Sequence, residues 1–354
     1  MTQIYAFPGA QNVYVPTPGD AEAARGALIV DYGRNVADFD INKYCQIIPT
    51  KRQQGLYMKM TVEQAGRVVN TNLADFEWPD GDVRPEGRSE LESFTFLPYT
   101  TKRRDYPYTM GYLTSEQADW NILAQHSRIH AQRAMTARTV FAVAKLQNVN
   151  NWSSSHKADV ASISGNSGRW DQSTTARSDI KRSLNYAAEQ ILLDTLGAVK
   201  LSDLMLVMGP GTARRICESQ EIINAIIQSP DALAQVRGEL PGRNVMFGLP
   251  DQLFGFPVIV DPTVRVSTRK LASSTTKAFV WDMSIPIMMA RPGGLVGLEG
   301  SPNFATAGFF MKEEMTVETF DEPQNRRIVC GIVEDWDFQI ISDVSGFAFT
   351  TAVA

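Results

Sequence analysis

The residues of this chain best suited to chemistry are two histidines four positions apart. His126 and His130 would share one face of a helix, which is the spacing of a metal-binding pair. A zinc peptidase carries glutamate directly after the first histidine, whereas this chain has Ser127 there, and His156 is the only other histidine. We therefore interpret the pair as histidines on a helix surface in a polar interface, and we expect no bound metal ion.

Two glycine-containing segments could bind phosphate or present a nucleophile. Residues 209–214, Gly-Pro-Gly-Thr-Ala-Arg, follow an apolar strand and open a helix, which is the context of a phosphate-binding turn. They lack the third glycine of the dinucleotide fingerprint and the Lys-Ser/Thr ending of a phosphate loop, so we expect a plain strand-to-helix turn. Residues 165–168, Gly-Asn-Ser-Gly, do not have the spacing of a nucleophile elbow, and no strand precedes them.

Paired carboxylates are the remaining candidates for acid–base chemistry. Glu313–Glu314 and Glu334–Asp335 occur where predicted strands meet turns, and we interpret both pairs as solvated faces. With three histidines and no intact nucleophile or metal motif, we expect no enzyme activity, no catalytic residues and no cofactor. The alternative is an α/β enzyme whose active site has no recognisable motif.

The composition is that of a large globular protein. The chain has 354 residues, enough for two sizeable cores, and 44% of them are apolar. No apolar run approaches the roughly 18 residues that span a bilayer, and the N-terminus carries no secretory signal. Cys45, Cys217 and Cys330 are far apart and odd in number, so we predict reduced thiols in a cytosolic protein. The net charge of −5 argues against a dedicated nucleic-acid binder.

Residues 1–50 do not look like an independent domain. Proline and glycine punctuate the segment, which opposes continuous helix or central strand. Apolar residues are nevertheless frequent, so we predict an extended arm that buries its side chains against another surface. The alternative is a poorly ordered terminus.

Basic and acidic residues occupy different parts of the segment 51–112. Alternating apolar residues predict strands at 56–62 and 94–97, with turn chemistry at 79–82 between them. Basic residues, among them Lys51 and Arg52, lie at the base of this hairpin. Residues 73–93 hold seven acids against two arginines, and the acids nearest the turn include Asp80, Asp82 and Glu86. An isolated two-stranded hairpin has only marginal stability in water, so we expect this hairpin to pack against a neighbouring subunit. The alternative is an ordinary solvated hairpin.

A long helix and a mixed α/β region follow. Thr114–Gln117 resembles a capping box with Thr114 as N-cap, and apolar residues then recur at helical spacing as far as about residue 148, roughly nine turns. Strands at 204–208, 258–261 and 278–281 alternate with helical segments. Two extended C-terminal segments, 315–320 and 326–333, are joined by a turn at 321–325.

The order of features from Trp152 onward resembles the major capsid proteins of tailed bacteriophages. The features are a Trp-bearing segment with Gly168–Asp171, a helix start at Ser178–Ile180, a helix end at Gly197, and apolar strands at 204–208 and 253–260. The resemblance covers most of the chain from about residue 51. It implies the α+β fold of the Hong Kong phage capsid, with an N-terminal arm (1–50), an extended β-hairpin loop (51–112), a peripheral domain with a long spine helix and a β-sheet (113–176 and 305–342), and an axial α/β domain (177–304 and 343–354).

The same resemblance implies a structural function. The subunit would assemble with itself into hexamers and pentamers of an icosahedral phage head, which encloses double-stranded DNA without reading its sequence. Expected partners are scaffolding, portal and decoration proteins, with no membrane, and the location is the virion after assembly in the host cytoplasm. Because Met1 directly precedes the arm, we expect a separate scaffolding protein or none. We expect no covalent crosslink, since no motif selects Lys51 or Lys59 as a donor. An encapsulin, a bacterial nanocompartment shell of the same fold, is the alternative, although the Pro-rich arm differs from the N-terminal helix expected there.

The functional residues of such a protein would lie in contacts between subunits. Residues 228–251 combine glycine and proline with apolar side chains, which suggests a surface that meets a partner around the five- and six-fold axes. The alternative is that this segment folds back on its own core. The candidate contact residues are Lys51, Arg52, Asp80, Asp82, Glu86, Leu240, Val245 and Phe247.

Overall fold

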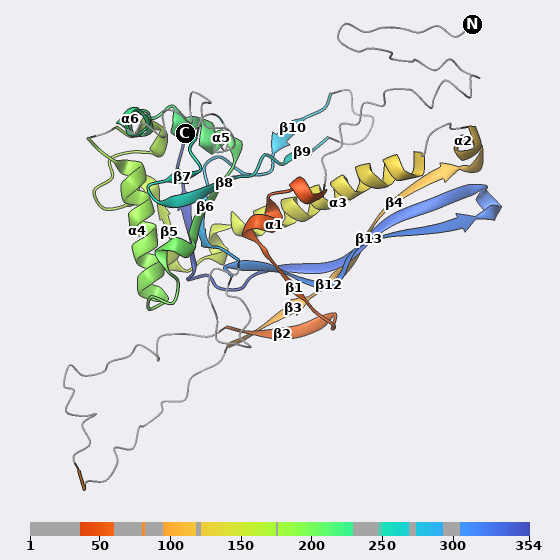
Figure 1. The fold of residues 1–354 in the computed structure, drawn as a ribbon, viewed down its shortest axis with the longest axis horizontal. Helices are drawn as coiled ribbons and strands as arrows, with labels where there is room; N and C mark the ends of the chain where they lie inside the picture. The colour runs from red at the N-terminus through yellow and green to blue at the C-terminus, as the bar shows by residue number, and fades with distance from the viewer. Residues whose placement is uncertain are drawn as a thin grey trace, which may run out of the picture.

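The computed structural model describes residues 36–59, 80–81, 95–117, 122–174, 176–228, 247, 249–268, 274–292 and 305–354. Two larger β-sheets organise this part of the chain, and one long helix runs along the first of them (Figure 1). A bundle of shorter helices lies beside the second sheet, at the opposite end of the molecule (Figure 1).

The first sheet has four strands built around a long C-terminal hairpin. Its strands, in spatial order, are β1 (Gln46–Pro49), β12 (Ala307–Glu322), β13 (Arg327–Ile340) and β4 (Lys102–Gly111). β12 and β13 are antiparallel and are joined through a short 3-10 turn at Pro323–Asn325. The two predicted C-terminal strands and the turn between them are therefore confirmed. β4 pairs with β13 along its whole length, so the second half of segment 51–112 is part of this sheet.

The long helix α3 (Ile122–Leu146) packs on one face of this sheet. Its 25 residues give a length of roughly 37 Å. Ala134 and Ala142 are fully buried, and the small side chain of Ala142 lets the helix approach the aromatic core of Phe309 and Phe338. The prediction of a long Ala-rich helix is confirmed.

The predicted start of this helical region is wrong. Helix α2 (Tyr112–Gln117) begins two residues before Thr114, directly at the end of β4. The Tyr112 N–H donates to the Arg326 carbonyl at 3.0 Å, so the turn that leads into β13 bonds the start of the helix.

A buried ion pair joins α3 to β13. Arg138 donates to the Glu334 carboxylate at 2.5 Å, and both side chains are at most 5% exposed. Tyr106 donates to the other carboxylate oxygen at 3.4 Å, and burial together with Glu334 raises the pKa of Tyr106 to about 12. The expectation that Glu334 and Asp335 lie on a solvated face is wrong, because β13 is a central strand between β12 and β4 and a helix covers it.

The second sheet has six strands and two buried faces. Its strands, in spatial order, are β5 (Lys157–Asp159), β14 (Gly346–Thr350), β11 (Ile287–Ala290), β6 (Leu204–Met208), β8 (Phe256–Val260) and β7 (Gln252–Leu253). All five residues of β6 are buried. Leu204, Leu206 and Met208 join the core beneath the helices, whereas Met205 and Val207 join the core shared with α3. One strand therefore ties the two halves of the molecule together.

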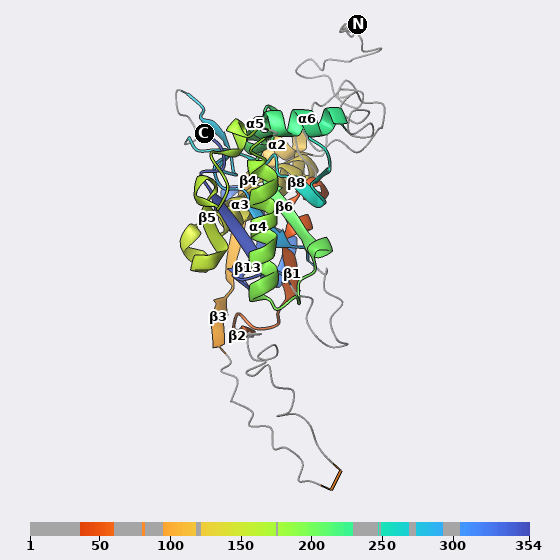
Figure 2. The same ribbon diagram turned by 90° about the vertical axis from the view of Figure 1, so that its left-hand side faces the viewer.

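Helix α4 (Asp179–Asp194) covers the outer face of this sheet, as Figure 2 shows from that side. Its N-terminus is capped from outside the helix by Glu221, which accepts from the Ile180 and Lys181 N–H groups at 3.0 Å each. Glu221 lies on α6 (Gln220–Gln228), and α5 (Pro210–Cys217) precedes it. The predicted helix start at Ser178–Ile180 is confirmed, but nothing in the local sequence indicates that a residue 40 positions away would cap it.

The end of the predicted arm is part of the core. Within residues 36–50, Phe39, Ile41 and Tyr44 are buried, the last two in helix α1 (Ile41–Tyr44). The Tyr44 hydroxyl donates to buried Asp261 at 2.8 Å, and burial and that carboxylate raise the Tyr44 pKa well above its ordinary value. These residues therefore hold the first sheet against the second; residues 1–35 lie outside the described part.

We predict that removing one partner of the Arg138–Glu334 ion pair destabilises the fold much more than removing both. Arg138→Met alone leaves a buried carboxylate without its partner and should lower the free energy of unfolding by about 3–5 kcal/mol. Arg138→Met combined with Glu334→Leu removes both charges and should cost much less. Urea unfolding of the unassembled wild-type chain and of both variants measures these free energies. Equal costs for the single and the double variant contradict this account.

Candidate functional site

The candidate site is a two-stranded hairpin that leaves the end of the first sheet. Its strands are β2 (Gln54–Lys59) and β3 (Thr95–Thr100), antiparallel and in register from Gln54↔Thr100 to Lys59↔Thr95. Figures 1 and 2 place the hairpin below the four-stranded sheet, away from both cores. The predicted strands are confirmed at 56–59 and 95–97, and the predicted turn is present at Asp80–Gly81, where Gly81 has a φ of +89°. Residues 60–62, 79, 82 and 94 of these predictions lie outside the described residues.

Aromatic packing fixes the base of the hairpin. The Tyr99 ring stacks on Phe310 of β12, with 4.4 Å between ring centroids and 5° between the planes, and Tyr57 lies 5.2 Å from the same ring. Gly55 faces Tyr99 across the hairpin, and a Cβ at Gly55 would lie 2.5 Å from the Tyr99 hydroxyl oxygen. Glycine is therefore needed there, so that Tyr99 can cross its own strand partner and reach the sheet.

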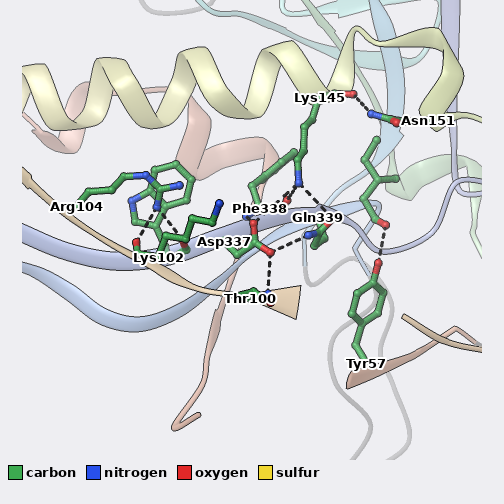
Figure 3. Close-up of polar contacts among 11 residues, drawn as sticks. Tyr57, Thr100, Lys102, Arg104, Lys145, Asn151, Asp337, Phe338 and Gln339 are labelled. Atoms are coloured by element: carbon green, nitrogen blue, oxygen red, sulfur yellow. Dashed lines mark hydrogen bonds and ion pairs between the residues drawn. The ribbon is translucent and has the colours of Figure 1, made fainter. Parts of the chain in front are cut away.

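A polar cluster around Asp337 completes the attachment (Figure 3). The Thr100 N–H donates to the Asp337 carboxylate at 3.2 Å, and the Gln339 amide donates to it at 2.7 Å. The Tyr57 hydroxyl donates to the Ile340 carbonyl at 3.3 Å. Both strands of the hairpin are thus bonded to β13, so the direction in which the hairpin leaves the sheet is set by the sheet itself.

Lys145 connects the same cluster to the long helix. Its ammonium donates to the Phe338 carbonyl at 2.6 Å and to the Gln339 side-chain oxygen at 3.3 Å, and it lies 3.9 Å from Asp337. Burial lowers the pKa of Lys145, the Asp337 carboxylate opposes this, and the neighbouring cations Arg104 and Lys102 add to it. The C-terminal end of α3 therefore supports the strand that holds the hairpin.

Arg104 of β4, the strand that pairs with β13, also contacts this part of β13. Its guanidinium lies 3.6 Å from the centroid of the Trp336 ring, and it donates to the Trp336 carbonyl at 2.7 Å and to the Lys102 carbonyl at 2.9 Å. These contacts join distant segments of the same chain, and together they fix how the hairpin leaves the sheet. The site is therefore built to position a segment of chain.

The histidine pair has a structural explanation. Tyr108 of β4 stacks on His130 with 4.6 Å between centroids and lies 5.7 Å from His126. Burial lowers the pKa of His130, with smaller contributions from Arg133 and His126. No cluster of three or more His, Cys, Asp or Glu side chains arranged for a metal ion occurs among the described residues.

The predicted strand-to-helix turn at Gly209 is also explained by packing. A Cβ at Gly209 would lie 2.7 Å from Cβ of Trp281, so the glycine lets β6 pass close to that residue. All three cysteines are free thiols, as predicted. No helix in the described ranges is both long and apolar enough to span a membrane.

The predicted contact residues are partly described. Lys51 and Arg52 are exposed just before β2, and Asp80 is exposed at the turn. Phe247 is 54% exposed with a φ of +54°. Asp82, Glu86, Leu240 and Val245 lie outside the described residues. The sequence analysis missed Asp337, Tyr99 and Lys145, whose partners are more than 190 positions away in the chain.

We predict that Asp337→Ala loosens the hairpin without unfolding the protein. The variant leaves the Thr100 N–H and the Gln339 amide without their acceptor, which should cost about 1–3 kcal/mol. Hydrogen exchange of peptide 95–101 should accelerate, while exchange of α4 stays unchanged. Glu314→Ala, an exposed carboxylate on β12, is the matched control. Unchanged exchange in peptide 95–101 contradicts this role of Asp337.

Solved structures of phage proteins are similar in fold to this chain. No protein-family model and no curated protein matches the sequence. A phage-related protein from Bordetella bronchiseptica is similar in structure with a TM-score of 0.54 and 13% identity, over 96% of this chain and 99% of that one. The mature capsid of bacteriophage PhiM1 gives 0.52 and 10%, over 98% and 91%. The capsid of cyanophage P-SCSP1u gives 0.51 and 9%, over 96% and 93%. The chain therefore has the α+β fold of the tailed-phage capsid proteins.

Proposed function

We propose that this chain is a major capsid protein, a subunit that assembles with itself into the icosahedral head of a phage. The observation that carries the proposal is the hairpin β2–β3, which is held firmly at its base yet leaves both cores. Leu56 and Phe96 on this hairpin are 64% and 56% exposed. Large exposed apolar side chains on a projecting hairpin are typical of a surface that a partner covers.

We also propose how the chain is divided into domains. We assign residues 1–50 to an arm, 51–112 to the extended loop, 113–176 and 305–342 to a peripheral domain, and 177–304 and 343–354 to an axial domain. Since β1 and β4 lie in the four-stranded sheet, residues 36–50 and 102–111 also support the peripheral domain. Leu240, Val245 and Phe247 belong to the surface that would meet neighbours around the five- and six-fold axes.

The further partners follow from the same role. A closed head made of hexamers and pentamers holds double-stranded DNA by enclosure, which agrees with a net charge of −5 and needs no sequence reading. Scaffolding, portal and decoration proteins are the proposed partners, and the subunit would assemble in the host cytoplasm and end in the virion. We propose no catalytic role.

The test of this function is the assembly state of the purified protein. Size-exclusion chromatography followed by negative-stain electron microscopy should show closed shells, or rings of five and six subunits. A monomer or a small oligomer without rings, at every concentration and ionic strength tried, contradicts the proposal and favours a different class of protein.

We predict that the acidic turn of the hairpin contributes to assembly. Reversing Asp80, Asp82 and Glu86 together to lysine should reduce particle yield, because like charges would then meet where opposite charges met. Single surface ion pairs contribute only about 0–1 kcal/mol, but a shell repeats each contact in every subunit. The melting temperature of the monomer should not change. The matched control, Asp80→Asn, Asp82→Asn and Glu86→Gln, should give an intermediate yield, and a normal yield from the lysine variant contradicts the prediction.

A further inference from the structure

A groove of about 950 Å³ runs along the side of α3, between β4 and strand β9 (Val264–Val266). Among the described residues, β9 pairs only with β10 (Lys277–Phe279), so this small hairpin stands beside α3 and forms one wall of the groove. The strand predicted at 278–281 is present as β10, and it pairs with β9 outside the six-stranded sheet.

The groove exposes apolar side chains. Ile129 and Phe141 of α3 are 43% and 36% exposed, and Val264 and Val266 of β9 are 44% and 57% exposed. A two-stranded hairpin with exposed valines has little stability of its own. A contiguous apolar surface of this kind indicates that another chain covers it.

The positive charge of the groove indicates which kind of chain segment could bind in it. Arg104, Arg133 and Arg265 line it, and none of the described lining residues is a carboxylate. Arg104 is engaged with Trp336 and two carbonyls, whereas Arg133 and Arg265 are exposed and form no ion pair with any described residue. The occupant that fits is therefore a segment with both carboxylates and exposed apolar side chains.

The opposite edge of the same sheet carries such a segment. β1 pairs with β12 only at residues 308–311, so from Lys312 onward the outer edge of β12 has no strand partner among the described residues. Val317 and Phe320 on this free half are 58% and 52% exposed. The exposed acids on it are Glu314, Glu318 and Asp321. An unpaired strand edge readily adds to another chain.

We propose that residues 312–322 of β12 in one copy dock into the α3–β4–β9 groove of a second copy. This inference rests on the proposed function and names the surfaces through which the subunits meet. Because side chains alternate along this part of β12, Glu318 and Phe320 face one wall of the groove, and Val317 and Asp321 face the other. The wall formed by α3, with Arg133, and the wall formed by β9, with Arg265, therefore each meet one carboxylate and one apolar side chain. Because the two surfaces lie at opposite edges of one sheet, the contact is head-to-tail, which is the type of contact from which rings of subunits are built.

Packaged DNA is the competing occupant of the groove. Its phosphates match the arginines, but they leave Ile129, Val264 and Val266 in contact with water. The acidic and apolar strand matches both features of the groove, so the observations favour a second copy of the chain.

A charge-swap experiment tests the proposal on the full chain. The variant Arg133→Glu/Arg265→Glu and the variant Glu318→Arg/Asp321→Arg should each lower the yield of rings and shells at least about tenfold, since like charges face each other in the contact. Combining all four substitutions in one chain restores opposite charges and should return the yield to near the wild-type level. Lys181→Glu/Lys200→Glu, two exposed lysines outside the groove, is the matched control and should assemble normally. Sedimentation velocity measures the assemblies, and circular dichroism confirms that every variant is folded.

The outcomes separate this inference from the proposed function. If the wild-type chain forms no rings or shells, the proposed function is wrong and the inference falls with it. If the wild type assembles but the groove variant assembles equally well, only the inference is overturned. Normal shells that retain less DNA would assign the groove to nucleic acid instead. Failure of the four-substitution chain to recover, or an equal loss in the lysine control, also overturns the proposal.

Discussion

The packing of α3 on β13, with the Arg138–Glu334 ion pair at its centre, is the contact on which the rest of the molecule depends. Burying two charges is costly, and the 2.5 Å contact between Arg138 and Glu334 offsets part of that cost. The pair therefore favours one registry of helix on strand. That registry places Lys145, two helical turns further on, over the Phe338 carbonyl.

Side chains alternate between the two faces of β13, so the registry of α3 on β13 also decides which residues of β13 face the hairpin. Glu334, Trp336 and Phe338 face α3 and its core, so Asp337 must point to the other face of the sheet. Phe310, which pairs with Asp337 in the sheet, points the same way. The hairpin binds these two residues, one by hydrogen bonds and one by aromatic stacking. A slip of one residue would exchange the two faces and would remove the attachment.

Much of the fold was predictable because its elements carry strong local patterns. The Ala-rich helix, the buried strand at 204–208 and the two long C-terminal strands all have the periodicity of their structure over many residues. Predictions failed where a partner distant in sequence overrides the local pattern. Helix α2 starts without the Thr114 cap because a carbonyl of Arg326 bonds its first N–H. The sequence around Glu334 suggests an exposed carboxylate, but in the fold Glu334 is buried and bonded to Arg138 and Tyr106.

The sequence by itself determined the type and order of the elements, the acidic turn flanked by basic residues, and the lack of a motif for catalysis, because composition, spacing and periodicity are local properties. Only the tertiary structure decided which residues hold the hairpin and which surfaces stay open. The Asp337 cluster joins residues more than 190 positions apart, and the basic groove and the acidic strand edge arise at opposite sides of one sheet. The strand order that creates these contacts depends on long-range pairing, to which each short stretch of sequence contributes only one edge.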